Sequence, residues 1–196
     1  MKRLFDIIFS GIVLLFFLPL GLMIALSIVL ESRGGIFFKQ ERIGRNGVPF
    51  GLLKFRSMRT NSELGGKITV GSRDARITKV GYYLRKFKLD EFPQFINVLK
   101  GEMSIVGPRP EVKDFVDLYT DEQRLILRVR PGITDEASLA YFHENELLAK
   151  SENPQHTYIH EVMPAKLKLN LKYISNPTLG QDLVIIWKTF AKIFRA

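Results

Sequence analysis

Two adjacent carboxylates, Asp90 and Glu91, are the residues whose types and spacing are most typical of chemistry in this chain. Apolar residues with helical spacing follow at 92–99 and end at Gly101, so the pair lies at the start of a predicted helix. An acid at this position is also typical of an N-cap, because it accepts hydrogen bonds from free backbone N–H groups and interacts favourably with the helix dipole. The pair therefore has both a structural and a catalytic interpretation.

Cationic side chains around the pair favour the catalytic interpretation. Arg85 precedes it, Arg109 follows it in the rigid turn 107–110, and Lys54 lies upstream. Carboxylates among such cations are expected to have lowered pKa values and to stay ionised. An ionised Asp90 could attack phosphorus, and Glu91 could hold Mg²⁺, which binds through one or two carboxylates together with substrate phosphates. Arginine side chains would then bind the phosphate oxygens.

An uncharged apolar segment, residues 7–30, must be placed relative to this site. This segment is longer than the roughly 20 residues that a helix needs to cross a bilayer core. It is also longer than the apolar core of a signal peptide. Pro19 favours a bend, and Lys and Arg residues flank the segment on both sides, which is typical of two cytoplasmic flanks. The sequence predicts either a re-entrant helix that breaks near Pro19 or a kinked spanning helix, with Asp6 at headgroup depth.

Composition sets the class of protein and excludes several kinds of site. The chain has 196 residues, of which 46% are hydrophobic, and this excludes intrinsic disorder and fits one domain. It has no Cys, which excludes disulfides, thiolate zinc sites and Cys nucleophiles. The positive charge is concentrated in residues 33–88, where 14 Lys and Arg residues and three acids give +11, so the rest of the chain carries −2 of the net +9. This block fits lipid headgroups or a polyanionic substrate; without a recognition motif, we expect no nucleic acid partner.

The remaining elements follow from periodicity and turn residues. We expect two short strands at 36–38 and 50–55, joined through a turn at 44–47, and a loop at 61–74. Helices are expected at 77–87, 89–101, 110–128, 144–150 and 164–174. A last helix carries an apolar stripe that we interpret as core, with docking at the membrane interface as the alternative: Leu179, Leu183, Ile186, Trp187, Phe190 and Phe194.

Six features, in this order, resemble the bacterial sugar transferases, which are monotopic polyprenol-phosphate phosphoglycosyl transferases. No single feature is specific, but the ordered set is, and it covers most of the chain. The matching features are the apolar segment with Pro19, Lys54-Phe55-Arg56-Ser57-Met58, residues 85–94 with Asp90-Glu91, Asn97-Val98-Leu99-Lys100-Gly101-Glu102-Met103-Ser104, Val106-Gly107-Pro108-Arg109-Pro110 and Arg130-Pro131-Gly132-Ile133-Thr134.

The resemblance implies a fold and a location. The fold would be α+β and mainly helical, with a small β element, an N-terminal re-entrant membrane helix and interfacial amphipathic helices. Residues 1–32 would form the re-entrant helix, and residues 33–196 would form a cytoplasmic catalytic domain. The enzyme would lie on the cytoplasmic face of the bacterial inner membrane. It would be a minimal catalytic unit, because the chain does not show the several-helix extension of larger members.

The resemblance also implies a reaction and its residues. A sugar 1-phosphate would pass from a UDP-sugar to undecaprenyl phosphate with release of UMP, in the first membrane step of a surface glycoconjugate pathway. Asp90 would be the nucleophile and would carry a phosphosugar intermediate. Glu91 would hold Mg²⁺, and Arg85, Arg109 and Lys54 would bind phosphate.

One departure and two rival functions remain open. After Thr134 many relatives continue with a Gly-Leu-Ala-Gln-Val-like stretch, whereas this chain has residues 135–140 of a different type, so the sugar cannot be inferred. The rivals are a lipid phosphatase that uses an aspartyl-phosphate and a non-catalytic basic membrane scaffold. A homodimer is compatible with the sequence, which does not reveal the oligomeric state or the pathway.

Overall fold

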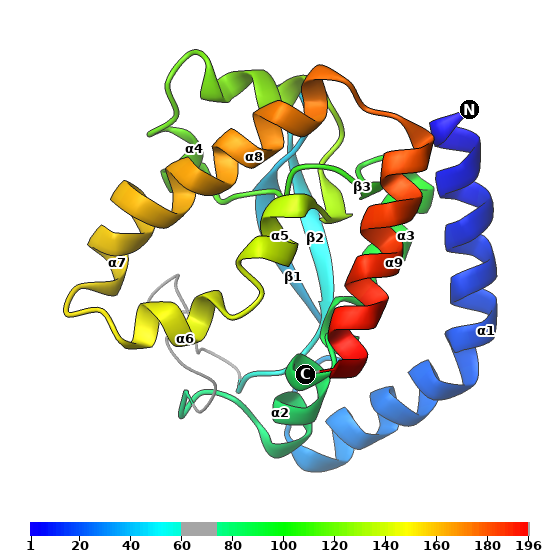
Figure 1. Cartoon of the computed structure of the whole chain (residues 1–196). Coiled ribbons are helices and arrows are strands. Elements are labelled where there is room, and N and C mark those ends of the chain that lie inside the picture. Colours follow the sequence, from blue (N-terminus) through cyan, green and yellow to red (C-terminus); the bar gives the residue numbers. More distant parts are fainter. Residues whose placement is uncertain (60–73, 196) are drawn as a thin grey trace.

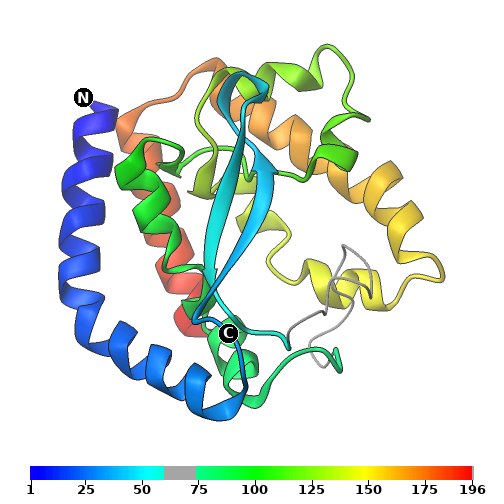
Figure 2. The ribbon, with the colours of Figure 1, turned by 180° about the vertical axis from the view of Figure 1, so that it is seen from behind.

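The hairpin of β1 (Phe37–Ile43) and β2 (Pro49–Phe55) lies at the centre of the structure, a computed structural model that describes residues 1–59 and 74–195 (Figure 1). Across the molecule the order is α1 (Lys2–Glu31), then α3 (Gln94–Lys100) and α9 (Leu179–Arg195), then the hairpin, then α8 (Met163–Ser175), as both views show (Figures 1 and 2). The predicted α+β class, mainly helical with a small β element, is confirmed.

The two predicted strands form an antiparallel hairpin, but β1 runs to Ile43, well beyond the predicted end at residue 38. The register of the hairpin pairs Phe38 with Lys54 and Arg42 with Phe50, and the predicted turn is the short helix η1 (Arg45–Gly47). Asn46 occupies the left-handed region there, with φ of 58°, which Asn tolerates better than most residues. The hairpin brings Lys54 to the middle of the fold. Of the predicted loop 61–74, only residue 74 lies within the described residues.

Two helices lead into and out of the Asp90 region. The first, α2 (Lys79–Lys86), begins at Thr78, whose hydroxyl accepts from Gly81 N at 2.9 Å. It packs so closely on the preceding segment that a Cβ on Gly81 would meet Ser57 O at 2.0 Å. A one-turn helix, η3 (Leu89–Glu91), then leads to α3, which ends at Gly101 as predicted.

A short parallel pair holds the loop that carries Arg109. Strand β3 (Ser104–Val106) pairs with β4 (Gly132–Thr134). Just after β3 the two backbones touch, because a Cβ on Gly132 would meet Gly107 N at 2.1 Å. Only glycine at these two positions permits such an approach, so Gly107 and Gly132 together fix where the loop begins.

The predicted helix over 110–128 is wrong. The structure has two short pieces, α4 (Lys113–Val116) and η4 (Gln123–Arg128). The backbone at Glu111 accepts instead from Ile43 N at the end of the hairpin, at 2.9 Å. Further along, Thr120 and Gln123 exchange side-chain-to-backbone hydrogen bonds, a capping box that marks the start of the second piece.

The second half of the chain is a series of helices that surround the hairpin. The predictions at 144–150 and 164–174 are confirmed by α6 and α8, with small shifts at their ends. In this half, α6 spans Glu144–Ala149, and the other helices are α5 (Glu136–Ala140), α7 (Pro154–Thr157) and the π-helix η5 (Tyr158–Val162).

Three apolar clusters form the core. One lies under α8 and includes Tyr158 and Leu167, and a second lies between α3, β3 and α9 around Val98 and Ile185. The third packs the C-terminal half of α1 on Phe55 and α2. Each cluster joins segments far apart in the sequence, so the elements that carry Lys54, Asp90 and Arg109 share one packed body.

Helix α1 is long and apolar enough to cross a membrane, and it contains Pro19. It bends around one side of the molecule (Figure 1). Near its start Arg3 donates to Val98 O and Leu99 O in α3. At its end Glu31 accepts from two backbone N–H groups at the start of α2, and Arg56 donates to Ile28 O and Ser32 O. Both ends of α1 are therefore bound to the same body.

Asp6, which the sequence analysis expects at headgroup depth, binds another element of the protein. Its side chain is buried and accepts from Ser104 Oγ at 2.9 Å and Ile105 N at 3.2 Å. This carboxylate satisfies donors at the start of β3, so its role is to bind α1 to the protein rather than to lipid.

The interpretation of the α9 stripe as core is also wrong. Ile186 is buried, but Leu183, Trp187, Phe190 and Phe194 are exposed. The buried face of α9 lies next to this stripe and includes Asp182, which accepts from Lys2 Nζ and Tyr173 Oη. These contacts fix the rotation of the helix and leave its aromatic residues on the surface.

Candidate active site

Asp90 is held at the turn between α2 and α3. Lys88 adopts a left-handed conformation with φ of 55°, which costs a non-glycine residue on the order of 1 kcal/mol. The reversal directs Asp90 inward, where it is 5% exposed. Among the described residues its Oδ1 atom has no hydrogen-bond partner. The N-cap interpretation is wrong, because Pro93 occupies the N-cap of α3 and no side chain caps that helix.

Burial raises the pKa of Asp90 above its ordinary value, and the neighbouring charge of Glu91 raises it further. Lys54, Arg85 and Lys88 act in the opposite direction without reversing the shift. The expectation that both carboxylates have lowered pKa values is therefore wrong for Asp90. A desolvated carboxylate with a raised pKa is a stronger base and a better nucleophile than one in water.

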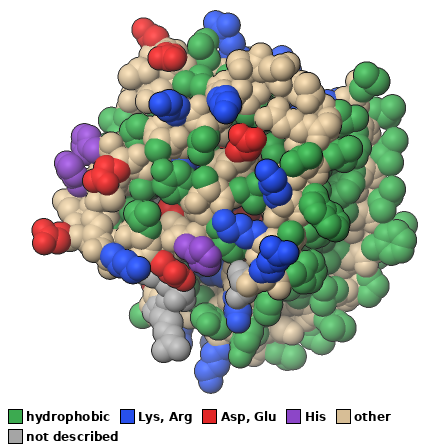
Figure 3. All heavy atoms as spheres, viewed as in Figure 1, with side chains coloured by type: hydrophobic (Ala, Val, Ile, Leu, Met, Phe, Trp, Pro, Cys, Tyr) green, Lys and Arg blue, Asp and Glu red, His purple; other side chains and the backbone are tan. Residues whose placement is uncertain are grey.

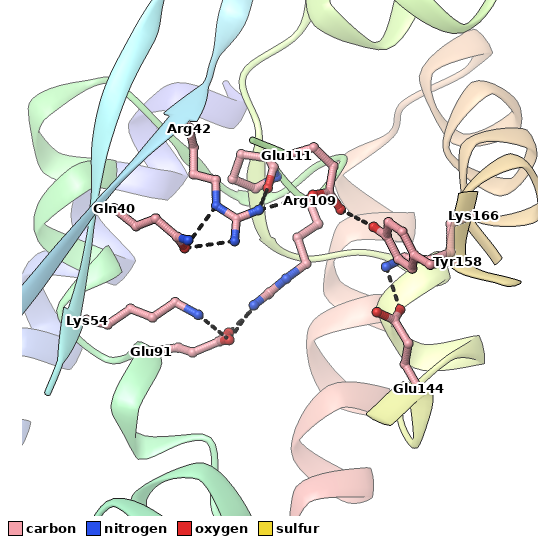
Figure 4. A network of polar contacts seen from close by, with 10 residues as sticks. Gln40, Arg42, Lys54, Glu91, Arg109, Glu111, Glu144, Tyr158 and Lys166 are labelled. Atoms are coloured by element: carbon pink, nitrogen blue, oxygen red, sulfur yellow. Dashed lines mark hydrogen bonds and ion pairs between the residues drawn. The ribbon is translucent and has the colours of Figure 1, made fainter. Parts of the chain in front are cut away.

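Glu91 lies beside Asp90, but its pKa is shifted in the opposite direction. Arg109 donates to both of its carboxylate oxygens, with Nη1 at 3.1 Å from Oε2, and Lys54 Nζ lies 3.4 Å from Oε1 (Figure 4). Burial alone would raise the pKa of Glu91, but Arg109 and Lys54 outweigh it and hold that pKa well below its ordinary value. The pKa values of two neighbouring carboxylates are thus shifted apart, which is typical of groups with separate roles.

Strand β2 and the loop after Gly107 position these two cations. Lys54 extends from β2, and burial lowers its pKa although Glu91 opposes the shift. Arg109 follows the contact of Gly107 with Gly132, and its backbone N–H donates to Asp135 Oδ2 at 3.1 Å. Glu91 in turn raises the pKa of the Arg109 guanidinium. The structure therefore brings Lys54, Glu91 and Arg109 together as the sequence predicted.

Arg85 is the predicted site residue with the least direct contact. It lies in the last turn of α2, where its charge lowers the pKa of Asp90. Its guanidinium makes no hydrogen bond or ion pair with another residue of the described ranges. The structure thus places Arg85 near the pair and leaves its side chain available to a ligand.

Asp135 belongs to the stretch that departs from many relatives, and its role is visible in the structure. It is fully buried, accepts from the Arg109 backbone, and caps α5 by accepting from Ser138 N at 2.6 Å. A short acid is suited to both tasks because its carboxylate serves two backbone donors at once. This residue therefore supports the Arg109 loop.

A second polar network that the sequence analysis missed lies behind Arg109 (Figure 4). Arg42 on β1 donates to Gln40 Oε1 at 2.8 Å, to Pro110 O and to Glu111 Oε2, and Tyr158 donates to the other oxygen of Glu111. The sequence contained a sign of this network, because Gln40 and Arg42 are two residues apart and therefore lie on the same face of the strand. Only the hairpin register shows that they lie near Lys54.

The carboxylates available to a magnesium ion are those of Asp90 and Glu91. Asp90 and Glu91 are adjacent carboxylates, and one oxygen of Asp90 lacks a partner among the described residues. Both oxygens of Glu91 accept from cations, so an ion there would compete with Lys54 and Arg109. Residues 1–59 and 74–195 contain no cluster of three or more His, Asp or Glu, and Mg²⁺ needs only one or two carboxylates when substrate phosphates complete its shell.

Comparison with known proteins gives a consistent result. A family model described as bacterial sugar transferase matches residues 1–196. An Aeromonas hydrophila UDP-N-acetylgalactosamine-undecaprenyl-phosphate N-acetylgalactosaminephosphotransferase is 38% identical over 197 residues, which cover 98% of this chain and 43% of that protein. A Klebsiella pneumoniae UDP-glucose:undecaprenyl-phosphate glucose-1-phosphate transferase is also 38% identical, with 98% of this chain and 40% of that protein covered.

A third relative is closer to this chain in length. The exopolysaccharide production protein ExoY of Rhizobium meliloti is 34% identical over 207 residues, with 98% of this chain and 84% of that protein covered. The chain thus spans less than half of the first two relatives and most of the third. Together with the matching family model, these similarities confirm the resemblance drawn from the ordered motifs: the chain belongs to the bacterial sugar transferase family.

Proposed function

We propose that this protein transfers a sugar 1-phosphate from a UDP-sugar to undecaprenyl phosphate and releases UMP. The printed names of the Aeromonas and Klebsiella relatives describe such reactions. The observation that carries the proposal is the buried Asp90 carboxylate with an unpartnered oxygen, beside a Glu91 that Arg109 and Lys54 bind. This site combines a desolvated nucleophile with cations suited to phosphate.

In the first half-reaction, a carboxylate oxygen of Asp90 attacks the phosphorus that bears the sugar. The bond from this phosphorus to the bridging oxygen breaks, and that oxygen leaves with UMP. An aspartyl phosphosugar remains on the protein. In the second half-reaction, a phosphate oxygen of the polyprenyl phosphate attacks the same phosphorus and displaces the Asp90 carboxylate, which regenerates the enzyme.

The cations of the site make this attack feasible. Both substrates are anions that a carboxylate repels, so the repulsion must be offset at the transferring phosphorus. Arg109, Lys54 and Arg85 supply fixed positive charge on the elements described above. Mg²⁺ held by Glu91 would neutralise phosphate charge further when bound.

The contacts at the two ends of α1 support a membrane arrangement. A straight helix of its 30 residues would be about 45 Å long, so a straight span would carry its ends to opposite sides of a bilayer. Arg3 is instead bound to α3, and Glu31 to the start of α2. These contacts support a re-entrant helix over residues 1–32. The Lys and Arg residues on both flanks of the helix support a catalytic domain, residues 33–196, on the cytoplasmic face of the inner membrane.

An acceptor-dependence assay tests the proposed reaction. Purified protein in detergent with Mg²⁺ should release UMP continuously from one member of a panel of UDP-sugars only when undecaprenyl phosphate is present. Without acceptor, UMP should stop at one equivalent per enzyme. Continuous release without acceptor would indicate a phosphatase, and no release with any donor would support a scaffold. In a surface glycoconjugate pathway this would be the first membrane step.

A further inference from the structure

A cavity separate from the Asp90 region lies between the C-terminal half of α9 and the segment that joins α5 to α6. Its volume is about 500 Å³. The lining residues are Leu139, His143, Lys188, Ala191, Lys192 and Arg195.

Three of the six residues that line the cavity carry a positive charge. Lys188, Lys192 and Arg195 lie on successive turns of one face of α9, at spacings of four and three residues. Lys192 donates to Leu139 O at 2.7 Å, which fixes it at the cavity wall. Within residues 1–59 and 74–195, Lys188 and Arg195 pair with no acid, and His143 lies 3.7 Å from Glu146. Three cations that share a concave wall are suited to an anion, and phosphate suits them best.

The exposed aromatic stripe of α9 runs directly beside this basic face. It consists of Leu183, Trp187, Phe190 and Phe194, and Trp187 is 75% exposed. Figure 3 shows Lys and Arg side chains next to a broad hydrophobic band over α9 and α1. A soluble nucleotide would fill the basic cavity and leave the stripe exposed to water. An amphiphile with a phosphate head and a long apolar tail would match both surfaces.

One aromatic ring connects the cavity to the Asp90 region. Lys192 Nζ lies 5.3 Å from the centre of the Phe142 ring, and Lys88 Nζ lies 5.4 Å from the centre of the same ring. Lys88 is two residues before Asp90, and its charge lowers the pKa of that carboxyl. The Phe142 ring therefore contacts one cation from the cavity and one from the turn that carries Asp90.

We infer that this cavity receives the phosphate head of the polyprenyl phosphate acceptor while the isoprenoid tail lies along the aromatic stripe. The inference rests on the proposed function and deepens it, because it assigns an entry site to the acceptor as opposed to the donor. Lys188 and Arg195 bind the phosphate, and Trp187 and Phe190 contact the tail. None of these residues lies at the Asp90 centre.

The test is direct binding in detergent without any UDP-sugar. The probe is a fluorescent short-chain polyprenyl phosphate, measured by anisotropy. The double variant K188E/R195E should weaken binding by about tenfold or more, since it removes two charge-assisted contacts and adds repulsion. Both side chains are exposed, so the fold should survive, and an unchanged melting temperature checks this. The matched control K168E, at an exposed lysine on α8, should bind as wild type does.

Competition distinguishes the sources of phosphate. Unlabelled polyprenyl phosphate should displace the probe, whereas UMP, inorganic phosphate and a short-chain phosphatidylglycerol should not at the same concentration. Displacement by UMP would make the cavity a nucleotide site, and displacement by phosphatidylglycerol would make it a general anionic-lipid surface. Either result, or wild-type binding by K188E/R195E, overturns the inference.

Kinetics separate failure of this inference from failure of the proposed function. K188E/R195E should raise the KM for undecaprenyl phosphate and leave the single equivalent of UMP released without acceptor unchanged. If wild-type protein releases no UMP, the proposed function fails, and the binding measurement still decides the cavity. If the variant changes the KM for the UDP-sugar instead, the inference fails and the proposed function stands.

Discussion

The buried aspartates of this protein fall into two groups that occupy different regions. Beneath α1 and α9, Asp6 accepts from two donors of β3, and Asp182 accepts from Lys2 and Tyr173. Asp135 accepts from Arg109 N and Ser138 N. At the α2–α3 turn, Asp90 is equally buried, yet one of its oxygens has no partner among the described residues.

This difference separates structural acids from a reactive one. A buried carboxylate that is fully hydrogen-bonded stabilises the segments it joins, whereas an unsatisfied one destabilises the fold. Such a group persists where function requires it. Its environment also differs, because burial and Glu91 raise the pKa of Asp90. The two regions should therefore respond oppositely to the same substitution.

The largest expected effect is on turnover at Asp90. Asp90→Asn should lower kcat by on the order of a thousandfold or more, since the amide cannot act as the nucleophile. Its melting temperature should equal or exceed that of wild type, because a desolvated charge and its repulsion with Glu91 are removed. UMP release and calorimetry on the same preparation check both expectations. A stable variant that turns over normally would remove Asp90 from the chemistry.

Asp182→Asn should give the reverse pattern. The amide keeps the shape but leaves Lys2 without its charged partner, so the free energy of unfolding should fall by about 2 kcal/mol. The kcat of the folded fraction should stay near wild type. Thermal unfolding with parallel UMP-release kinetics measures both quantities. Loss of kcat without loss of stability would place Asp182 in the reaction.

Arg109→Lys tests the cation that binds Glu91. Lysine keeps the charge but cannot donate to both Glu91 oxygens, so kcat/KM should fall by about a hundredfold. Lys113→Arg, at an exposed ion pair with Asp117, is the matched control and should be neutral. Steady-state kinetics with varied UDP-sugar provide the measurement. An unchanged kcat/KM in Arg109→Lys would mean that the paired donors are dispensable.

The smallest expected effect is a shift in the acid limb of the pH profile. Turnover requires ionised Asp90, so kcat/KM should fall as the pH drops through a pKa that lies above the ordinary 3.8. Arg85 lowers this pKa, and Arg85→Gln should therefore move the limb to higher pH. The kcat/KM profile of both proteins checks the direction. Movement to lower pH would contradict the assignment of the limb to Asp90.

Local sequence patterns predicted much of this architecture. Short strand-like runs on both sides of a turn placed the strand that carries Lys54, helical spacing placed α3 after Asp90, and the ordered motifs identified the family. The gathering of Lys54, Glu91 and Arg109 follows from these elements. The capping box of Thr120 and Gln123 starts a new helical piece inside the range 110–128, where a single helix was expected.

What the sequence could not show depends on tertiary contacts. Asp6 and Asp182 look like surface acids until Ser104, Tyr173 and Lys2 are brought to them. These contacts set the rotation of α9, which reverses the expectation for its aromatic stripe. The raised pKa of Asp90 likewise results from burial, and a list of neighbouring cations carries no information about burial.

The most direct test of the central claim is intact-protein mass spectrometry of enzyme quenched with acid after mixing with its UDP-sugar and Mg²⁺ in the absence of acceptor. Wild-type protein should gain the mass of one sugar phosphate, and peptide mapping should place it on Asp90. Undecaprenyl phosphate should then remove it. Asp90→Asn should gain nothing. Product formation by wild-type protein that never carries the adduct, or an adduct on Asp90→Asn, would contradict the account.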